Sequence, residues 1–169
     1  MNMVKRFRHA GFTLIELIIV ITIVAILAAM ALPRFIDAQR DARVAKTNAI
    51  FGSVRTAAML AKSRCELDNS PSSNVTNPCN PKSNSSNVLM EGAGVSMVYG
   101  YPAGTLSGIE VAAQINVTSD GLSRVISGTG LYYNVTGGTD QTCSIYYTPA
   151  VSATGTVTAP VATVDTTGC

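Results

Sequence analysis

One carboxylate, Glu16, lies near the start of an apolar run of 20 residues that extends from Leu14 to Pro33. A helix of that length, at about 1.5 Å rise per residue, spans the hydrocarbon core of a bilayer, which is about 30 Å thick. A charged group inside the bilayer costs on the order of 3 kcal/mol, so a carboxylate there usually has a partner. The run therefore predicts a membrane-spanning helix, and Glu16 predicts a specific counter-ion.

A short basic leader, with Lys5 and Arg6, precedes the run and ends in Gly11. Basic residues beside a membrane helix are typical of its cytoplasmic end, so the rest of the chain is expected on the far side of the membrane. Cleavage between Gly11 and Phe12 would create an amino terminus whose ammonium lies four residues from Glu16. We expect this ammonium, from a neighbouring copy or from the same chain, to be the counter-ion. Pairing between copies would fix the axial register of one helix on the next.

A secretory signal peptide is a rival interpretation, because small residues such as Ala28 and Ala31 could surround a cleavage site. The helical pattern continues past them, however, and predicts one helix from Thr13 to about Lys62 that only Pro33 interrupts. An ordinary membrane anchor would explain the length of the run but leaves Glu16 unexplained.

Small and apolar residues form a stripe along the second half of this helix. The stripe is suited to close packing, and we expect a sheet to bury it. Its members are Ala38, Ala42, Ala45, Ala49, Gly52 and Ala57, with Ile50, Val54 and Ala58 alongside.

The net charge of +2 hides an asymmetry along the chain. Seven basic residues and two acidic ones lie between Arg34 and Arg64, whereas two basic and seven acidic residues follow from Cys65 onward. The chain is thus a basic stalk joined to an acidic head. Two interpretations remain open: the charges are solvated surface, or the stalk and head of neighbouring copies attract each other.

All four cysteines, Cys65, Cys79, Cys143 and Cys169, follow the apolar run. They include no CxxC pair, and the only histidine, His9, lies in the leader, so no metal site is indicated. An even number of cysteines beyond an export segment is typical of disulfides in an oxidising compartment. Three connectivities are possible. We favour Cys65–Cys79 with Cys143–Cys169 because this pairing closes the shortest loops, and each bridge would stabilise the head by roughly 3 kcal/mol.

The residues after the long helix predict a loop and then a small antiparallel sheet. Three prolines and many Asn and Ser residues indicate a loop from Ser63 to Asn87. The string SGIE, Ser107 to Glu110, fits a capping box that opens a short helix to about Ile115. Runs rich in Val, Ile, Thr and Tyr predict strands at 95–101, 122–127, 131–136, 142–148 and 155–164.

No arrangement of residues in the head predicts catalysis, since no nucleophile has a base beside it and Glu110 and Asp120 are isolated. Asp140 and Asp165 could contribute to a Ca²⁺ site, but their oxygen ligands are scattered, so we predict no metal and no other cofactor. We expect the six tyrosines to pack in the sheet, because alternation along a strand places neighbouring side chains on opposite faces.

The string GFTLIELIIVITIVAILAAMALPRF, residues 11–35, resembles the class III signal and amino-terminal helix of type IV pilins. The resemblance implies that a prepilin peptidase cleaves between Gly11 and Phe12 and that Phe12 is N-methylated. It implies that Glu16, beside Thr13, acts in assembly by pairing with the Phe12 amine of an adjacent subunit. It also implies that the helix can loosen at Pro33 inside a filament, as the missing N–H of proline would favour.

Two downstream strings, PRFIDAQRDARVAKTNAIFGSVRTAAMLAK and VYGYPAGTLSGIEVA, are similar to the mannose-sensitive haemagglutinin branch of pilins. This extends the resemblance to about residue 115. A carboxy-terminal disulfide loop, as many pilins have, would be closed by Cys143 and Cys169.

The expected fold class is α+β. A long amino-terminal helix, half membrane-spanning and half amphipathic, packs on a small antiparallel β-sheet head, as in the pilin fold. We expect a leader at 1–11, a transmembrane and filament-core helix at 12–33, and a head at 34–169 that includes the amphipathic half of the helix.

The resemblance implies a structural, non-enzymatic subunit that polymerises into an extracellular type IV pilus for adhesion, surface attachment or motility. The expected partners are further copies of the chain in a helical filament, prepilin peptidase, the assembly platform and minor pilins. Before assembly we expect the chain in the inner membrane of a Gram-negative bacterium, and its acidic head gives no case for nucleic acid. A pseudopilin of a type II secretion system is the alternative. A membrane-anchored enzyme is a third hypothesis, for which no polar cleft can be located in the sequence.

Overall fold

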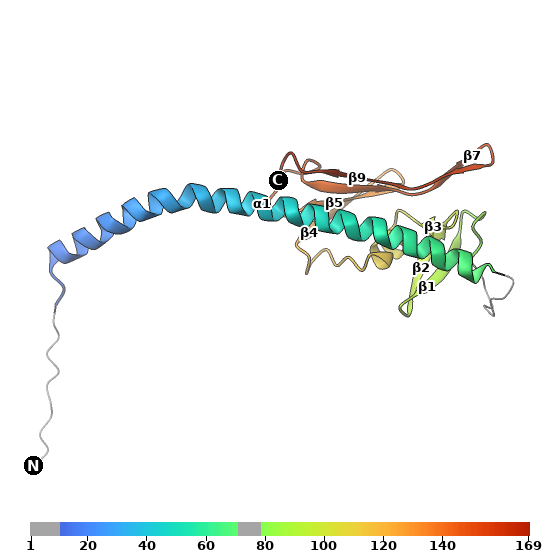
Figure 1. The fold of residues 1–169 in the computed structure, drawn as a ribbon, viewed down its shortest axis with the longest axis horizontal. Coiled ribbons are helices and arrows are strands. Elements are labelled where there is room, and N and C mark those ends of the chain that lie inside the picture. Colours follow the sequence, from blue (N-terminus) through green and yellow to red (C-terminus); the bar gives the residue numbers. More distant parts are fainter. Residues whose placement is uncertain (1–10, 71–78) are drawn as a thin grey trace, which may run out of the picture. The chain divides into compact units, whose positions relative to one another are not determined.

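The computed structural model describes residues 11–70 and 79–169, so most of the predicted leader and part of the predicted loop lie outside the described residues. The chain divides into two compact units, Met1–Gln39 and Arg40–Cys169. A long helix comes first and short strands follow it along the chain (Figure 1).

Helix α1 extends from Leu14 to Asp68 and continues through Pro33. Proline has no N–H to donate to the carbonyl four residues earlier, so the helix lacks one backbone hydrogen bond at this position. The helical pattern in the sequence therefore correctly predicts one continuous element on both sides of the proline.

The end of α1 lies at Asp68, and the prediction of an end near Lys62 is wrong. Two ion pairs between residues four apart, Lys62–Glu66 and Arg64–Asp68, stabilise the additional turn, with N···O distances of 3.6 and 3.1 Å. Cys65, which is fully buried and disulfide-bonded, ties this turn to the head. These contacts extend the helix into a segment whose composition is typical of a loop.

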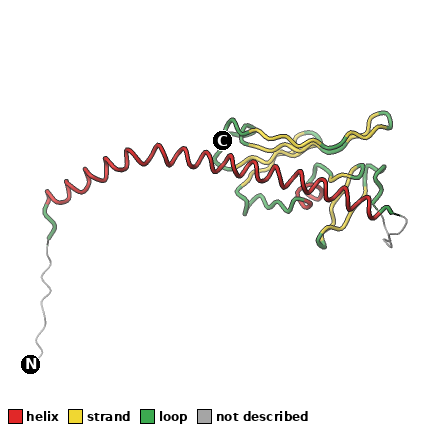
Figure 2. The backbone as a smooth tube through the Cα atoms, in the orientation of Figure 1, coloured by secondary structure: helices red, strands yellow, loops and turns green. Residues whose placement is uncertain are grey.

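The strands of the described part of the chain form three antiparallel sheets, yellow in Figure 2. The first sheet has the order β1-β2-β3, with strands Ser86–Met90, Ala93–Val98 and Tyr101–Pro102. The second has the order β4-β5-β6-β9, with strands Leu122–Ser127, Gly130–Val135, Ser144–Thr148 and Val161–Asp165. The third is a hairpin of β7, Val151–Ala153, and β8, Thr156–Thr158.

Strand β1 begins at the end of the predicted loop, and no strand was predicted at its residues. It pairs with β2 across a tight turn at Glu91 and Gly92, whose φ angles of 49° and 82° reverse the chain. The pairing places Val88 opposite Val95 and buries both side chains. Burial of this pair stabilises β1. The polar residues before Val88 gave no sign of a strand in the sequence.

Two predicted strands are each interrupted. The run 95–101 divides into β2 and β3 because Tyr99 and Gly100 take φ angles of 51° and 79° and turn the chain. The run 155–164 divides into β8 and β9 on either side of Pro160, which cannot donate a ladder hydrogen bond. The predicted strands at 122–127, 131–136 and 142–148 agree with β4, β5 and β6 to within two residues at each end.

The predicted capping box is wrong, and the segment forms a π-helical turn, η1, at Leu106–Glu110. Thr105 takes the N-cap position without a side-chain cap, and Gly108 has φ −100° and ψ −105°, which is not helical. The carboxylate of Glu110 pairs with Arg124 on β4. It does not accept a hydrogen bond from the backbone N–H at the start of the turn, as a capping box would require.

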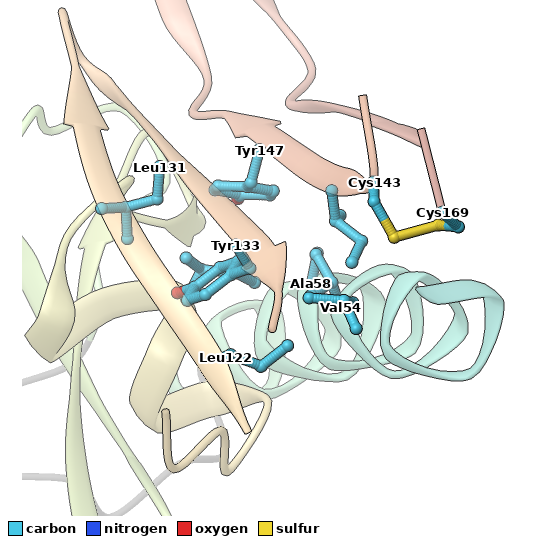
Figure 3. Packing of buried hydrophobic residues seen from close by; sticks show 11 residues of the cluster. Val54, Ala58, Leu122, Leu131, Tyr133, Cys143, Tyr147 and Cys169 are labelled. Carbon is cyan, nitrogen blue, oxygen red and sulfur yellow. A yellow bond between two sulfur atoms is a disulfide. The ribbon is translucent and has the colours of Figure 1, made fainter. Parts of the chain in front are cut away.

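The main hydrophobic core lies between α1 and the second sheet (Figure 3). Val54 and Ala58 of α1 face Leu131 and Tyr133 of β5 and Tyr147 of β6. A smaller cluster joins the end of α1 to the first sheet through Ala61, Cys65, Cys79, Val88, Val95 and Met97. This arrangement of a long helix on antiparallel sheets confirms the predicted α+β fold.

The expectation that the sheet buries the small-residue stripe is only partly correct. Ala57 and Ala58 are buried, but Ala42, Ala45 and Gly52 are exposed. The buried line of the helix is shifted and also includes a polar residue: Thr47, Val54, Ala57, Ala58, Ala61, Cys65 and Asp68. Sequence periodicity identifies a small face and a buried face, but the two overlap only near the end of the helix.

Candidate functional site

The first turn of α1 exposes the residues that we expect to act in assembly. Phe12, two residues before α1, is 82% exposed, and Glu16 is exposed in the first turn. Thr13 Oγ1 accepts a hydrogen bond from the Glu16 backbone N–H at 3.3 Å and donates one to Glu16 Oε2 at 3.3 Å. Thr13 thus acts as an N-cap, and an acid at this end of a helix also interacts favourably with the helix dipole. Sequence analysis did not assign this local role, although the spacing T-x-x-E is its known signal.

Large apolar side chains are exposed all around α1 from Leu14 to Ile36. A helix that is hydrophobic on every side is stable only in an apolar environment. By length and composition, α1 is long and apolar enough to cross a membrane. The exposed surface of this segment therefore has to be covered, by lipid or by other apolar helices.

Two disulfides hold the head: Cys65–Cys79 and Cys143–Cys169, with Cα–Cα distances of 5.0 and 4.7 Å. They are the sequential pairs, which close loops of 14 and 26 residues. The first joins the end of α1 to the segment before β1, and the second joins the start of β6 to the segment after β9.

The Cys143–Cys169 disulfide lies directly on α1. Thr47, which is completely buried, has its hydroxyl 3.7 and 3.6 Å from the two sulfur atoms and donates a hydrogen bond to the Arg43 carbonyl at 2.8 Å. Arg43 Nε donates to the backbone oxygen of Cys169 at 2.6 Å. Lys46 Nζ donates to the Gly121 carbonyl at 3.3 Å. Arg43, Lys46 and Thr47, which lie within one turn of α1, therefore hold the rest of the head against the helix. The charged side chains of Arg43 and Lys46 thus make hydrogen bonds that stabilise the fold.

A half-buried ion pair fastens η1 to the second sheet. Arg124 Nη1 donates to both carboxylate oxygens of Glu110, at 2.6 and 2.7 Å, and Tyr133 donates to Glu110 Oε2 at 3.5 Å. Burial, together with the neighbouring Glu110 charge, raises the pKa of Tyr133 above its ordinary value of 10.0. The cluster is satisfied internally and holds η1 in place.

Asp165, one of the two carboxylates considered for Ca²⁺, and Asp120, considered for catalysis, both accept local hydrogen bonds. Asp165 Oδ1 accepts hydrogen bonds from the Thr167 hydroxyl at 2.6 Å and from its backbone N–H at 2.9 Å, and these bonds lower the pKa of Asp165. Asp120 Oδ2 accepts from the Asn116 backbone N–H at 2.9 Å. Within the described ranges, no group of three or more His, Cys, Asp or Glu side chains could hold a metal ion.

The tyrosines of the second sheet divide between its two faces, as strand alternation predicts. Tyr133 and Tyr147 are buried in the core, and Tyr147 donates a hydrogen bond to the Pro102 carbonyl at 2.8 Å. Tyr132 and Tyr146 stack on the opposite face, with ring centroids 4.1 Å apart.

A known sequence motif matches the amino-terminal part of the chain. Residues 6–32 match the prokaryotic N-terminal methylation motif. This match covers residues 6–11 before the predicted cleavage site, the first turn of α1 and nearly all of its apolar run.

Two curated proteins are similar to about a third of the chain. One is the type IV narrow pilus major component PilA5 of Thermus thermophilus, 50% identical over 54 residues, which is 32% of this chain and 47% of the relative. The other is the fimbrial protein EcpB of Eikenella corrodens, 47% identical over 51 residues, which is 30% of this chain and 32% of that relative. The match thus spans about half of the first relative and a third of the second, and no solved structure matches this chain.

Proposed function

We propose that the chain is a structural subunit, and not an enzyme, that polymerises into an extracellular type IV pilus. The observation that carries this proposal is the methylation motif at residues 6–32, placed at the start of an exposed apolar helix that continues into a disulfide-bonded head. Similarity to a pilus component and to a fimbrial protein, each over about a third of the chain, supports it. The cell would use such a fibre for adhesion, surface attachment or motility.

The proposed assembly follows from the apolar surface of α1. In the membrane, lipid covers the exposed side chains between Phe12 and Ile36; in a fibre, the same side chains contact neighbouring helices. Burying 1,000 Å² of apolar surface from water would be worth about 25 kcal/mol before association costs. Relative to lipid the gain is far smaller, so extraction into a fibre needs an assembly platform that supplies energy.

The proposal assigns a step to each part of the chain. A prepilin peptidase removes the leader, residues 1–11, and Phe12 is then N-methylated. Glu16 pairs with the amine of Phe12 on an adjacent copy, and Pro33 allows the helix to loosen as residues 12–33 enter the filament core. The head, residues 34–169, then lies outside that core.

We further place the chain in the mannose-sensitive haemagglutinin branch, on the strings that follow Pro33 and surround Tyr101. The proposed location is the inner membrane of a Gram-negative bacterium before assembly and the extracellular pilus afterwards. Minor pilins would join the further copies of the chain as partners in the filament.

Mass spectrometry of fibres sheared from the cell surface tests the proposal. We expect an abundant chain that begins at Phe12, carries one methyl group on its amine and contains both disulfides. A protein that still begins at Met1, or that never appears outside the cells, would overturn the proposal.

A pseudopilin of a type II secretion system is the alternative, since it would use the same amino-terminal motif. A calcium requirement for folding of the head would favour the pseudopilin, and abundant sheared fibres would favour the pilin. Thermal unfolding of the purified chain with and without EDTA separates the two, and we expect no difference between the curves.

A further inference from the structure

A groove of about 390 Å³ lies beside α1, where the β1–β2 hairpin and the residues after η1 approach the helix. Figure 1 shows β1 and β2 beside the last part of α1. The walls of the groove are mostly apolar and come from all three segments, with Leu60 on α1, Met90 at the end of β1 and Val111 after η1. Leu60 is 56% exposed, so this surface is open to the alkyl part of a side chain from outside.

Two residues that line the groove have uncommon backbone conformations. Glu91 lies in the turn between β1 and β2 with a φ of 49°, and Gln114 has a φ of 53°. Glycine and asparagine take such left-handed positions at the lowest cost, so a Glu and a Gln there are strained. The amide of Gln114 donates a hydrogen bond to Glu91 Oε2, which joins the two strained residues. Strain of this kind persists where the side chains have a use, and here it brings a carboxylate and an amide together beside the groove.

The polar groups of the groove are left mainly as hydrogen-bond acceptors. Ser53 and Thr56 donate their hydroxyl protons to backbone carbonyls, at 3.3 and 2.8 Å. Glu91 Oε1 and the side-chain oxygen of Gln114 accept no hydrogen bond from a described residue. The lining contains one charged group, the Glu91 carboxylate, and no Lys or Arg. The chemistry that fits is a positive charge with several N–H donors on an alkyl stem, as in an arginine side chain.

The basic stalk of this chain carries arginines without a partner. Five cations of the stalk already contact carbonyl oxygens, acids or a ring of their own chain: Arg43, Lys46, Arg55, Lys62 and Arg64. Arg34 and Arg40 are exposed and make no hydrogen bond, ion pair or ring contact with a described residue. Arg34 adjoins the segment proposed for the filament core, whereas Arg40 lies six residues further along, or about 9 Å at 1.5 Å per residue.

We propose that the groove of one copy receives the Arg40 side chain of a second copy in the fibre. The guanidinium presents parallel N–H donors that match the two neighbouring oxygens of Glu91 and Gln114. The alkyl stem of the arginine packs on Leu60 and Met90. The inference rests on the proposed function and deepens it, because it names a contact between the stalk and the head of neighbouring copies.

The length of α1 requires that the arginine comes from another copy. Arg40 precedes Ser53, the first residue of the groove, by 13 residues along the same helix. At about 1.5 Å per residue, the two are about 20 Å apart along the helix axis, which is further than an arginine side chain reaches. Two copies that make the contact are therefore displaced along the axis by about 20 Å or more.

Exchange of the two charges tests the contact. Glu91→Arg and Arg40→Glu should each lower the yield of sheared fibres by at least about tenfold, because each puts like charges together. The combination of both should return the yield to within about threefold of the parent, because the pair is restored in reverse. Two matched combinations should not restore it: Glu91→Arg with Arg34→Glu, and Arg40→Glu with Asp140→Arg, in which Asp140 is an exposed acid elsewhere in the head.

Two further measurements do not depend on charge reversal. Ser63 is exposed on α1 one turn beyond Leu60, so a benzophenone amino acid at position 63 should crosslink, in fibres, to the peptide of a second copy that contains Arg40. Gln114→Gly should raise the melting temperature of the head, because glycine takes a positive φ without strain, and yet lower the fibre yield. A residue that serves only the fold would not give this combination.

Several results would overturn the inference and leave the proposed pilus intact. These are normal fibre yields in both single charge reversals, a double variant no better than the single ones, or crosslinks from position 63 that reach only other peptides. Circular dichroism of the purified variants shows whether a low yield comes from an unfolded head, and the crosslink then decides. Absence of fibres in the parent would overturn both the inference and the proposed function.

Discussion

The Thr13 hydroxyl donates a hydrogen bond to the Glu16 carboxylate at the first turn of α1, over 3.3 Å. Glu16 therefore has a partner within its own chain, which explains how an acid can occupy the start of an apolar helix before any copy is beside it. In a fibre, the amine of a neighbouring Phe12 would compete with Thr13 for the same carboxylate. The weaker neutral partner would give way to the charged one.

Glu16→Ala should abolish fibre formation while membrane insertion and leader cleavage continue, because only the pairing between copies needs the charge. Glu16→Gln, which keeps the local hydrogen bonds, should fail in the same way. Thr13→Ala removes the cap, worth about 1 kcal/mol, and should still form fibres. Electron microscopy of cells and immunoblots of sheared and membrane fractions measure these outcomes. Normal piliation in Glu16→Gln would contradict the role of the charge.

Replacing Cys143 and Cys169 together by serine should lower the free energy of unfolding of the head by about 3–4 kcal/mol, given the loop of 26 residues. The loss should exceed that from replacing Cys65 and Cys79, whose loop has 14 residues. Thermal unfolding by circular dichroism in detergent measures both. Equal losses would mean that the contact of the Cys143–Cys169 disulfide with Thr47 and its longer loop add nothing.

Arg124→Met should destabilise the head by about 1–3 kcal/mol, because it leaves the half-buried Glu110 carboxylate without its cation. Glu110→Gln combined with Arg124→Met should recover part of that loss, since no uncompensated charge remains. Urea unfolding of both variants measures the difference. A double variant no more stable than Arg124→Met alone would show that the pair is not coupled.

Alkaline pH should destabilise the head. Burial raises the pKa of Tyr133 and Tyr147 above the ordinary value of 10.0, so the unfolded chain releases these protons first as the pH rises. The folded state then binds more protons than the unfolded state, and stability falls above about pH 10. Tyr147→Phe should be less stable at pH 7, because it loses the hydrogen bond to Pro102, yet its melting temperature should fall less between pH 9 and 11.

Replacing Gly52 and Gly108 by alanine should change the stability of the head in opposite directions. Gly52 lies inside α1 with nothing within 4 Å of an added Cβ, so Gly52→Ala should stabilise the head by up to about 1 kcal/mol. A Cβ at Gly108 would lie 2.2 Å from the Ala103 carbonyl oxygen, so Gly108→Ala should destabilise it. Melting temperatures of the two variants test this, and a shift in the same direction for both would contradict it.

Local patterns in the sequence predict much of this fold. Alternating residues between glycines identify β4, β5 and β6, and the continuous helical period identifies α1 across Pro33. These features depend on neighbours within a few residues, so a single sequence contains their signal. The turn at Tyr99 is not visible in this way, because its positive φ arises from the packing of the segment and not from its residue type.

Features that depend on distant contacts are less predictable. The last turn of α1 depends on the disulfide of Cys65, and β1 depends on the pairing of Val88 with Val95. Glu110 fits a capping box by spacing, but Arg124 lies close enough to take its carboxylate. In the candidate assembly site, the roles of Phe12 and Glu16 follow from motif resemblance, whereas the cap at Thr13 requires the geometry.

The hydroxyl of Thr47 touches two sulfur atoms that lie 96 and 122 residues further along the chain. Contacts of such long sequence separation form slowly, because the entropy of closing the loop is lost before the contact is gained. We therefore expect the head to gain its resistance to proteases only after Cys143 and Cys169 have been joined beside Thr47. The rate of thiol oxidation, and not the formation of α1, should then limit how fast the head matures.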